Sequence, residues 1–165
     1  MKYYTADPHF GHNDIIMYCK RPFKNTGKMD AAIIKNYNKV LKEEDELFII
    51  GDVTIFSSER KPYIENLIKK IKCKKYLILG NHDRFKPFDY EDVGFISVHT
   101  ALEVDGFILR HDPACAIIAP EKTWLCGHVH TLFKRTKNVV NVGVDQWNFY
   151  PVSSDVLKSY LKMPS

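Results

Sequence analysis

Five short polar segments are spread from one end of this sequence to the other. The segments are Asp7-Pro8-His9, Gly51-Asp52, Gly80-Asn81-His82-Asp83, His111 and Gly127-His128-Val129-His130. Six of the seven histidines lie in or beside them. Such side chains bind metal ions, and one ion takes about four to six ligands. The set fills two sites if one carboxylate is shared, so the fold must bring both halves of the chain together.

Length and composition indicate a single soluble unit. The chain has 165 residues, of which 45% are hydrophobic and 27% charged, and we expect residues 1–165 to form one domain. No apolar run approaches the ~20 residues of a membrane helix. The first residues, 1–7, also lack the apolar core of a signal peptide. We therefore expect a cytoplasmic protein that makes no membrane contact.

Charge and cysteine content exclude few partners. The formal net charge of +4 permits an anionic substrate without requiring a nucleic acid. The densest lysine cluster, within 69–75, falls at a predicted helix C-terminus, where cations are favoured and usually solvated. The four cysteines show no paired spacing. This argues against a disulfide scaffold and against a cysteine-rich structural zinc site.

The order of the predicted elements is that of an α/β protein. Strands are expected at 2–6, 47–50, 76–79, 102–104, 107–109, 123–126 and 139–142. Helices are expected at 13–19, from Asp30 as N-cap to 41, from Pro62 to 71, and from Ser153 or Ser154 as N-cap to 161. Four of the five polar segments directly follow a predicted strand. Functional loops of α/β proteins lie at such strand ends.

Spacing within the segments suits shared ions. Asp7 and His9 lie on one extended turn, close enough to reach a single ion. His128 and His130 share one face of an extended segment, so they can serve one ion or two neighbouring ions. Asp52 can bridge two cations, because its two oxygens bind independently. Glycines beside these residues allow sharp turns and close backbone approach.

The five segments occur in the order D-x-H, G-D, G-N-H-D, H and G-H-x-H. This order resembles that of the calcineurin-like metallophosphoesterase superfamily over residues 7–130. Softer matches to a small bacterial and phage branch are His9-Phe10-Gly11-His12 with Arg21-Pro22-Phe23, and Asn141-Val142-Gly143-Val144-Asp145. The resemblance implies an α/β fold, a four-layer sandwich of two mixed β-sheets flanked by helices. It also implies a metal-dependent hydrolase that acts on phosphate esters.

The same resemblance implies two divalent metal ions and their ligands. One ion would be held by Asp7, His9 and His130. The other would be held by Asn81, His111 and His128, with Asp52 bridging the two. A hydroxide between the ions would attack phosphorus in line. Mixed nitrogen and oxygen ligands suit Mn²⁺, which we favour, with iron or Zn²⁺ as alternatives.

His82 is the residue that we expect to protonate the leaving oxygen or to stabilise its charge. Asp83 would orient and charge-stabilise that imidazole. The alternative for Asp83 is capping of its own loop by the side chain. Both residues are therefore candidates for the catalytic machinery, with a purely structural interpretation open for Asp83.

Candidate substrate contacts are less specific. Asn81 would lie near the substrate, and Arg84 and Arg110 could each grip a non-bridging phosphate oxygen. Such arginines more often pair with a nearby acid. His12 would either touch the substrate or brace the loop that carries His9.

These inferences favour a two-metal phosphoesterase that prefers phosphodiesters and has some activity on monoesters. The alternative is a metal-bearing protein-interaction scaffold of the same fold without turnover. The presence of His82 and of all seven candidate ligands favours the enzyme. A cyclic nucleotide, a dinucleotide, a nucleic-acid end and a phosphorylated metabolite all remain open as substrates, and the sequence does not indicate the oligomeric state.

Overall fold

The chain alternates strands and helices in its first half and is richer in strands in its second half. The computed structural model describes residues 1–55 and 58–163. Its strands are β1 (Lys2–Thr5), β2 (Glu46–Ile50), β3 (Lys74–Ile78), β4 (Ser97–His99), β5 (Leu102–Val104), β6 (Phe107–Leu109), β7 (Thr123–Cys126), β8 (Arg135–Thr136), β9 (Val139–Asn141) and β10 (Val152–Ser153). Its helices are α1 (Asp14–Tyr18), α2 (Thr26–Val40), α3 (Lys61–Lys69), α4 (Pro87–Asp92) and α5 (Ser154–Leu161), with 3₁₀ turns η1 (Ser58–Arg60), η2 (Pro113–Ile118) and η3 (Val144–Gln146).

The strands form two five-stranded sheets that pack face to face. The strand order is β10-β1-β2-β3-β4 in the first sheet and β5-β6-β7-β9-β8 in the second. The strands from β1 to β4 run parallel, as do β6, β7 and β9, whereas β10, β5 and β8 pair antiparallel. This is the predicted α/β sandwich of two mixed sheets.

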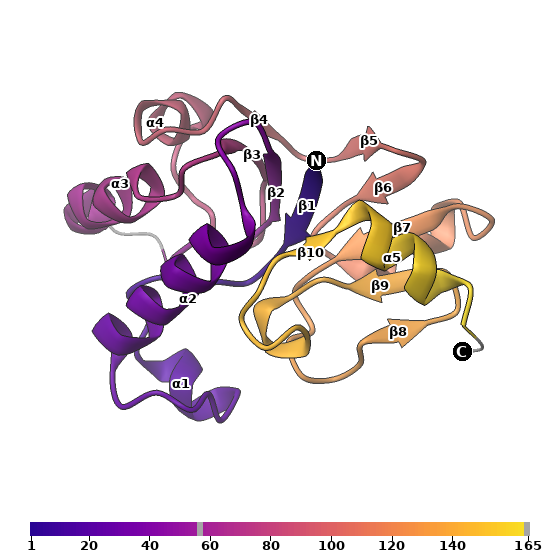
Figure 1. Ribbon diagram of the computed structural model, residues 1–165, viewed down its shortest axis with the longest axis horizontal. Helices are drawn as coiled ribbons and strands as arrows, with labels where there is room; N and C mark the ends of the chain where they lie inside the picture. Colours follow the sequence, from indigo (N-terminus) through magenta and orange to yellow (C-terminus); the bar gives the residue numbers. More distant parts are fainter. Residues whose placement is uncertain (56–57, 164–165) are drawn as a thin grey trace.

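Alternating side chains of the first sheet divide the interior into two cores. Leu47 and Ile49 of β2 belong to the cluster under the helices, whereas Phe48 and Ile50 belong to the cluster between the sheets. Successive residues of a strand point to opposite faces, so one apolar run serves both cores. Helices α2, α3 and α4 cover the outer face of this sheet (Figure 1).

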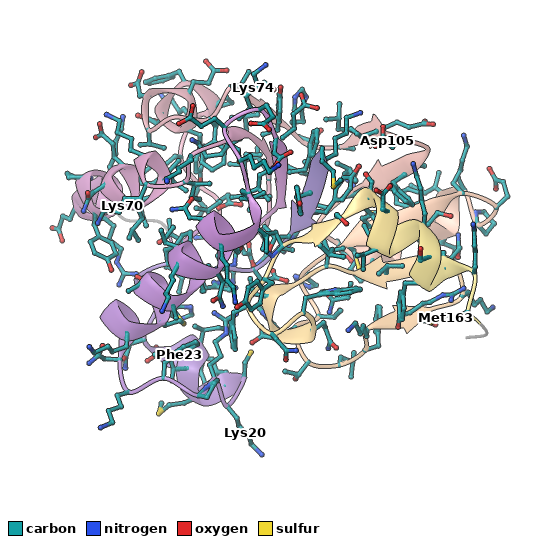
Figure 2. The ribbon with its side chains drawn as sticks, viewed as in Figure 1. Lys20, Phe23, Lys70, Lys74, Asp105 and Met163 are labelled. Carbon is teal, nitrogen blue, oxygen red and sulfur yellow. The ribbon has the colours of Figure 1, made fainter. Side chains whose placement is uncertain are left out.

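The outer face of the second sheet is covered by a small apolar cluster that includes the 3₁₀ turn η2. Trp124, Cys126 and Val139 pack there against Ala116 of η2. Helix α5 instead contributes Leu157 to the core between the sheets. The hairpin turn of β5 and β6, marked by Asp105 in Figure 2, was predicted from the sequence. None of the helices in the described ranges is both long enough and apolar enough to cross a membrane.

One predicted helix boundary was wrong. Helix α2 begins at Thr26, and the Asn25 side chain caps it by accepting from the Lys28 amide. Asp30 lies inside the helix, where its carboxylate accepts from the Gly11 amide at 2.9 Å and from the Tyr63 hydroxyl at 2.7 Å. Because the Asn25 side chain satisfies an amide of the first turn, the helix begins earlier than predicted. Two other predicted helix starts are confirmed. Pro62 lies in the first turn of α3, and the Ser153 side chain caps α5.

Candidate active site

The five polar segments meet at the edge of the sandwich where central strands of both sheets end. Backbone hydrogen bonds join these strand ends: the Asp7 amide donates to the Gly51 carbonyl, and the Gly127 amide donates to the His111 carbonyl, both at 3.1 Å. The segments follow β1, β2, β3, β6 and β7 in turn. The fold therefore brings together side chains that lie more than 120 residues apart, as from Asp7 to His128.

Asp52 lies at the centre of the site. Its Oδ2 is 3.5 Å from Nε2 of His9 and 3.3 Å from Nε2 of His111, while its Oδ1 accepts from the His82 amide at 2.9 Å. A single carboxylate oxygen thus faces both rings, so the geometry favours bridging through Oδ2 rather than one oxygen for each ion. Burial opposes ionisation, but the contact with His111 lowers the pKa of Asp52 to about 2.

One group of candidate ligands consists of Asp7, His9 and His130, whose ligand atoms all lie within 4.8 Å of one another. His9 is 1% exposed, and neither of its ring nitrogens has a hydrogen-bond partner among the described residues. An unpaired buried polar group costs about 1–3 kcal/mol. Burial also lowers the pKa of His9 well below its usual value, which keeps the ring in the neutral form that ligates metals. These side chains fit a metal ion.

A second group gathers around Asn81. Its Oδ1 lies 3.1 Å from Nε2 of His111 and 2.9 Å from Nδ1 of His128. Nδ1 of His111 lies 2.9 Å from the Ile50 carbonyl, and donation there makes Nε2, which faces Asn81 and Asp52, the nitrogen that would bind an ion once its proton is displaced. A backbone partner on the other ring nitrogen is the usual way in which proteins orient a metal-binding histidine. This group fits a second ion that shares Asp52 with the first.

The backbone of the site is strained at the candidate ligands themselves. Positive φ angles occur at Asp7 (55°), His9 (51°), Asp52 (54°), His128 (71°) and His130 (44°). The left-handed region costs an L-residue about 1–2 kcal/mol, and such residues cluster at functional sites. The neighbouring glycines leave room for these side chains, since a Cβ at Gly51 would overlap the His111 ring and one at Gly80 would overlap Asp52.

A buried ion pair that was not predicted from the sequence lies beside the first group. Arg21 donates from Nε and Nη2 to the two oxygens of Asp145, both at 2.8 Å, and the side chains are 0% and 2% exposed. Arg21 also donates to the carbonyls of Asp7 (2.8 Å) and Pro8 (3.0 Å). Asp145 Oδ2 lies 3.5 Å from Nδ1 of His130. The pair therefore fixes the loop of two candidate ligands and faces the ring of a third.

Asn141 holds the same region from the other sheet. It is fully buried, and its amide donates to the carbonyls of His130 at 2.8 Å and Phe133 at 3.0 Å, while its oxygen accepts from the Gly143 amide. Arg21, Asn141 and Asp145 all belong to the two softer sequence matches. Those matches were the signal for supporting residues, but the sequence alone did not show what they contact.

His82 and Asp83 occupy different positions in the site. His82 is half-buried, with its ring centroid 5.6 Å from that of His9. Asp83 is buried, and its carboxylate accepts from the amides of Gly80 (2.9 Å), Asp52 (2.7 Å) and Val53 (3.0 Å). Burial raises the pKa of Asp83 to about 6. These contacts match the loop-capping alternative rather than orientation of the His82 ring.

The candidate substrate contacts are divided between two cavities. Asn81 and Arg110 line a cavity of about 250 Å³ together with His111 and His128. His12 lines a larger cavity of about 580 Å³ together with His9 and His130 of the first group. Its amide donates to the His9 carbonyl at 3.0 Å, so it also braces that loop. Arg84 is exposed and is not among the described lining residues of either cavity.

Two curated relatives match most of the chain. Uncharacterized protein MJ1445 of Methanocaldococcus jannaschii is 29% identical, over 94% of this chain and 88% of the relative. Gene 66 protein of Mycobacterium phage L5 is also 29% identical, over 88% of this chain and 86% of the relative.

Solved structures share the fold. The protein of unknown function AQ665 from Aquifex aeolicus superposes with a TM-score of 0.76 at 26% identity, over 97% of this chain and 98% of the other. The nuclease MPE of Pseudomonas putida gives a TM-score of 0.54 at 24% identity, over 78% of this chain and 61% of the other, which shows the fold alone. The family profile described as calcineurin-like phosphoesterase matches residues 3–159. The chain belongs to the calcineurin-like phosphoesterase family.

Proposed function

We propose that the protein is a two-metal phosphodiesterase with some activity on phosphate monoesters. The observation that carries the proposal is the position of Asp52 Oδ2, which faces Nε2 of both His9 and His111 at 3.5 and 3.3 Å. Family membership supports metal-dependent hydrolysis of phosphate esters in general. The preference for diesters draws support from the two cavities, which leave room for a substituent on either side of the candidate metal centre.

The proposed metal ligands correspond to the two groups of side chains in the candidate active site. Asp7, His9 and His130 would hold the first ion, Asn81, His111 and His128 the second, and Asp52 would be shared. When bound, the two ions would supply a hydroxide nucleophile at neutral pH and neutralise the phosphate oxygens. Mixed nitrogen and oxygen ligands suit Mn²⁺.

Other residues of the chain would act on the substrate directly. His82 would donate a proton to the leaving oxygen, a contribution typically worth about 10²–10⁴-fold. Arg110, on the wall of the smaller cavity, would pair with a non-bridging phosphate oxygen. Asp83 would hold the 80–83 loop so that the His82 ring and Asn81 face the same centre.

The test is Mn²⁺-dependent hydrolysis of bis-p-nitrophenyl phosphate by wild type and by His82→Ala. Turnover should require added Mn²⁺ and should fall at least tenfold in the variant, with bound manganese unchanged. His99→Ala is the matched control, because His99 contacts Ser97 in β4 and lies outside both cavities as described. No turnover by wild type carrying two ions would refute the proposal and favour a non-catalytic scaffold.

A further inference from the structure

The larger cavity adjoins the candidate metal centre. Its described lining includes the imidazoles of His9, His82 and His130, so it opens directly onto the first group of candidate ligands. Its volume of about 580 Å³ lies within the range of pockets that bind small organic molecules. A phosphate group alone would fill only a small part of it.

Apolar side chains from two parts of the chain also line this cavity. Ile15 and Tyr18 come from α1, and Leu132 lies on the loop after β7. Helix α1 stands below α2 at the end of the molecule in Figure 1. Tyr18 is 74% exposed and Leu132 is 78% exposed, although both border a cavity that a ligand could fill. Large apolar groups held beside a polar centre are typical of small-molecule sites.

The charges of the two cavities differ. None of the described residues that line the larger cavity is a lysine or an arginine, and Asp14 adds a carboxylate. The smaller cavity, on the side of the second candidate ion, includes Arg110. A nucleic-acid strand needs cations for each further phosphate. The larger cavity therefore suits a group without a second phosphate.

The position of His82 indicates which part of a diester enters the larger cavity. A general acid must lie within hydrogen-bond reach of the oxygen that it protonates. Because His82 lines this cavity, the bond to be broken would point into it. The remaining substituent would then lie on the side of Arg110.

We propose that the larger cavity binds the leaving group of the substrate, and that this group is an uncharged alcohol or phenol carrying a flat aromatic ring, such as a nucleoside. The inference rests on the proposed phosphodiesterase function. Tyr18 and His12 are aromatic side chains in the described lining, and stacking on such rings tolerates different aromatic groups. Asp14 and Thr131 offer polar partners for hydroxyl groups at the same wall.

Binding of inert analogues tests the cavity without requiring turnover. Diphenylphosphinate and dimethylphosphinate carry the same anionic centre but no ester bond, and titration calorimetry can compare them on the Mn²⁺-loaded protein. We expect wild type to bind the diphenyl compound at least tenfold more tightly. In Tyr18→Ala/Leu132→Ala this preference should fall at least fivefold. Equal binding of the two compounds by wild type would overturn the proposal.

The matched control is Met17→Ala/Ile118→Ala. Met17 and Ile118 are 68% and 77% exposed, close to the values of Tyr18 and Leu132, and neither is among the described lining residues. The control should retain the wild-type preference. A similar loss in both double variants would overturn the assignment of the cavity, because it would reflect a general effect of removing exposed apolar groups.

Kinetics distinguish the leaving group from the retained group. Methyl p-nitrophenyl phosphate has one aromatic ring, and that ring leaves. Tyr18→Ala/Leu132→Ala should raise KM at least fivefold for both this ester and bis-p-nitrophenyl phosphate. A rise confined to the bis ester would place the retained group in the cavity and overturn the leaving-group assignment. No turnover by wild type, with the phosphinate preference intact, would refute the phosphodiesterase function and the leaving-group assignment while keeping an aromatic binding site.

Discussion

His128 illustrates what the site requires of single residues. It is exposed, its amide donates to both oxygens of Asp7 at 3.1 and 3.0 Å, and its φ is 71°. An L-residue is disfavoured at this angle, and an exposed position gives little packing in return. The side chain at this position is therefore explained by binding rather than by folding.

We predict that His128→Gly is more stable than His128→Ala by about 1 kcal/mol in the metal-free protein. Glycine adopts positive φ freely, whereas alanine keeps the strain. At ordinary positions the order is reversed, because glycine loses more backbone entropy on folding. Urea denaturation measures the difference. Greater stability of the alanine variant would mean that the left-handed backbone at this position is not a source of strain.

Two histidines of the site are expected to be protonated in the metal-free protein. Burial opposes their charge, but contacts with Asp52 and Asp7 raise the pKa of His111 to about 9. Likewise, despite burial, contacts with Asp145 and Cys19 raise the pKa of His130 to about 10. A metal ligand must be neutral, so an incoming ion has to displace these protons.

Metal binding at pH 7 should therefore release protons, and Mn²⁺ affinity should rise as pH increases from 7 through about 9. The sign follows from the raised pKa values: below them the metal-free state binds protons that the loaded state lacks. Calorimetry in buffers of different ionisation enthalpy counts the protons released. Binding without proton release, and with an affinity independent of pH in this range, would contradict the ligand assignment of His111 and His130.

At the scale of elements, the loop between α1 and α2 and the turn η3 form a single support for the first group of ligands. Figure 2 marks Phe23 in this loop, two residues after Arg21. The Arg21–Asp145 pair joins positions 124 residues apart and is almost fully buried. A buried charge is costly without its partner, so the two segments depend on each other.

Asp145→Asn should lower the free energy of unfolding by about 3–5 kcal/mol, because it leaves the Arg21 guanidinium buried without its counter-charge. It should also weaken Mn²⁺ binding about 10–100-fold, as loss of a partner behind a metal-binding histidine typically does. Chemical denaturation and metal titration measure the two effects separately. Glu65→Gln is the control, since it removes an exposed partner of Lys69 and should change neither.

A loss of stability without weaker Mn²⁺ binding would restrict Asp145 to a structural role. The reverse result, weaker metal binding with unchanged stability, would contradict the account of the buried ion pair. Only the combination of both losses fits a carboxylate that neutralises Arg21 and also orients His130.

For the molecule as a whole, the resemblance of the polar segments to the phosphoesterase superfamily implied the sandwich, and the element order predicted the place of the site, but neither predicted the contacts that support it. Apolar runs such as 47–50 indicate buried strands, and polar residues directly after them indicate loops at one edge. Arg21 and Asp145 could not be paired from the sequence, because their contact depends on how the two sheets pack. Asp30 was misplaced because Asn25 caps the helix earlier and because the partners that hold Asp30 inside it, Gly11 and Tyr63, come from other elements.

Both sheets converge on Asp52, and electron paramagnetic resonance of the Mn²⁺-loaded protein shows whether this carboxylate joins two ions. We predict two ions bound per chain and a signal from a spin-coupled pair, because one carboxylate oxygen faces His9 and His111 together. Asp52→Asn should weaken the coupling or lose an ion. A single ion per chain, or two ions that give only the signal of isolated Mn²⁺, would contradict the bridging role of Asp52.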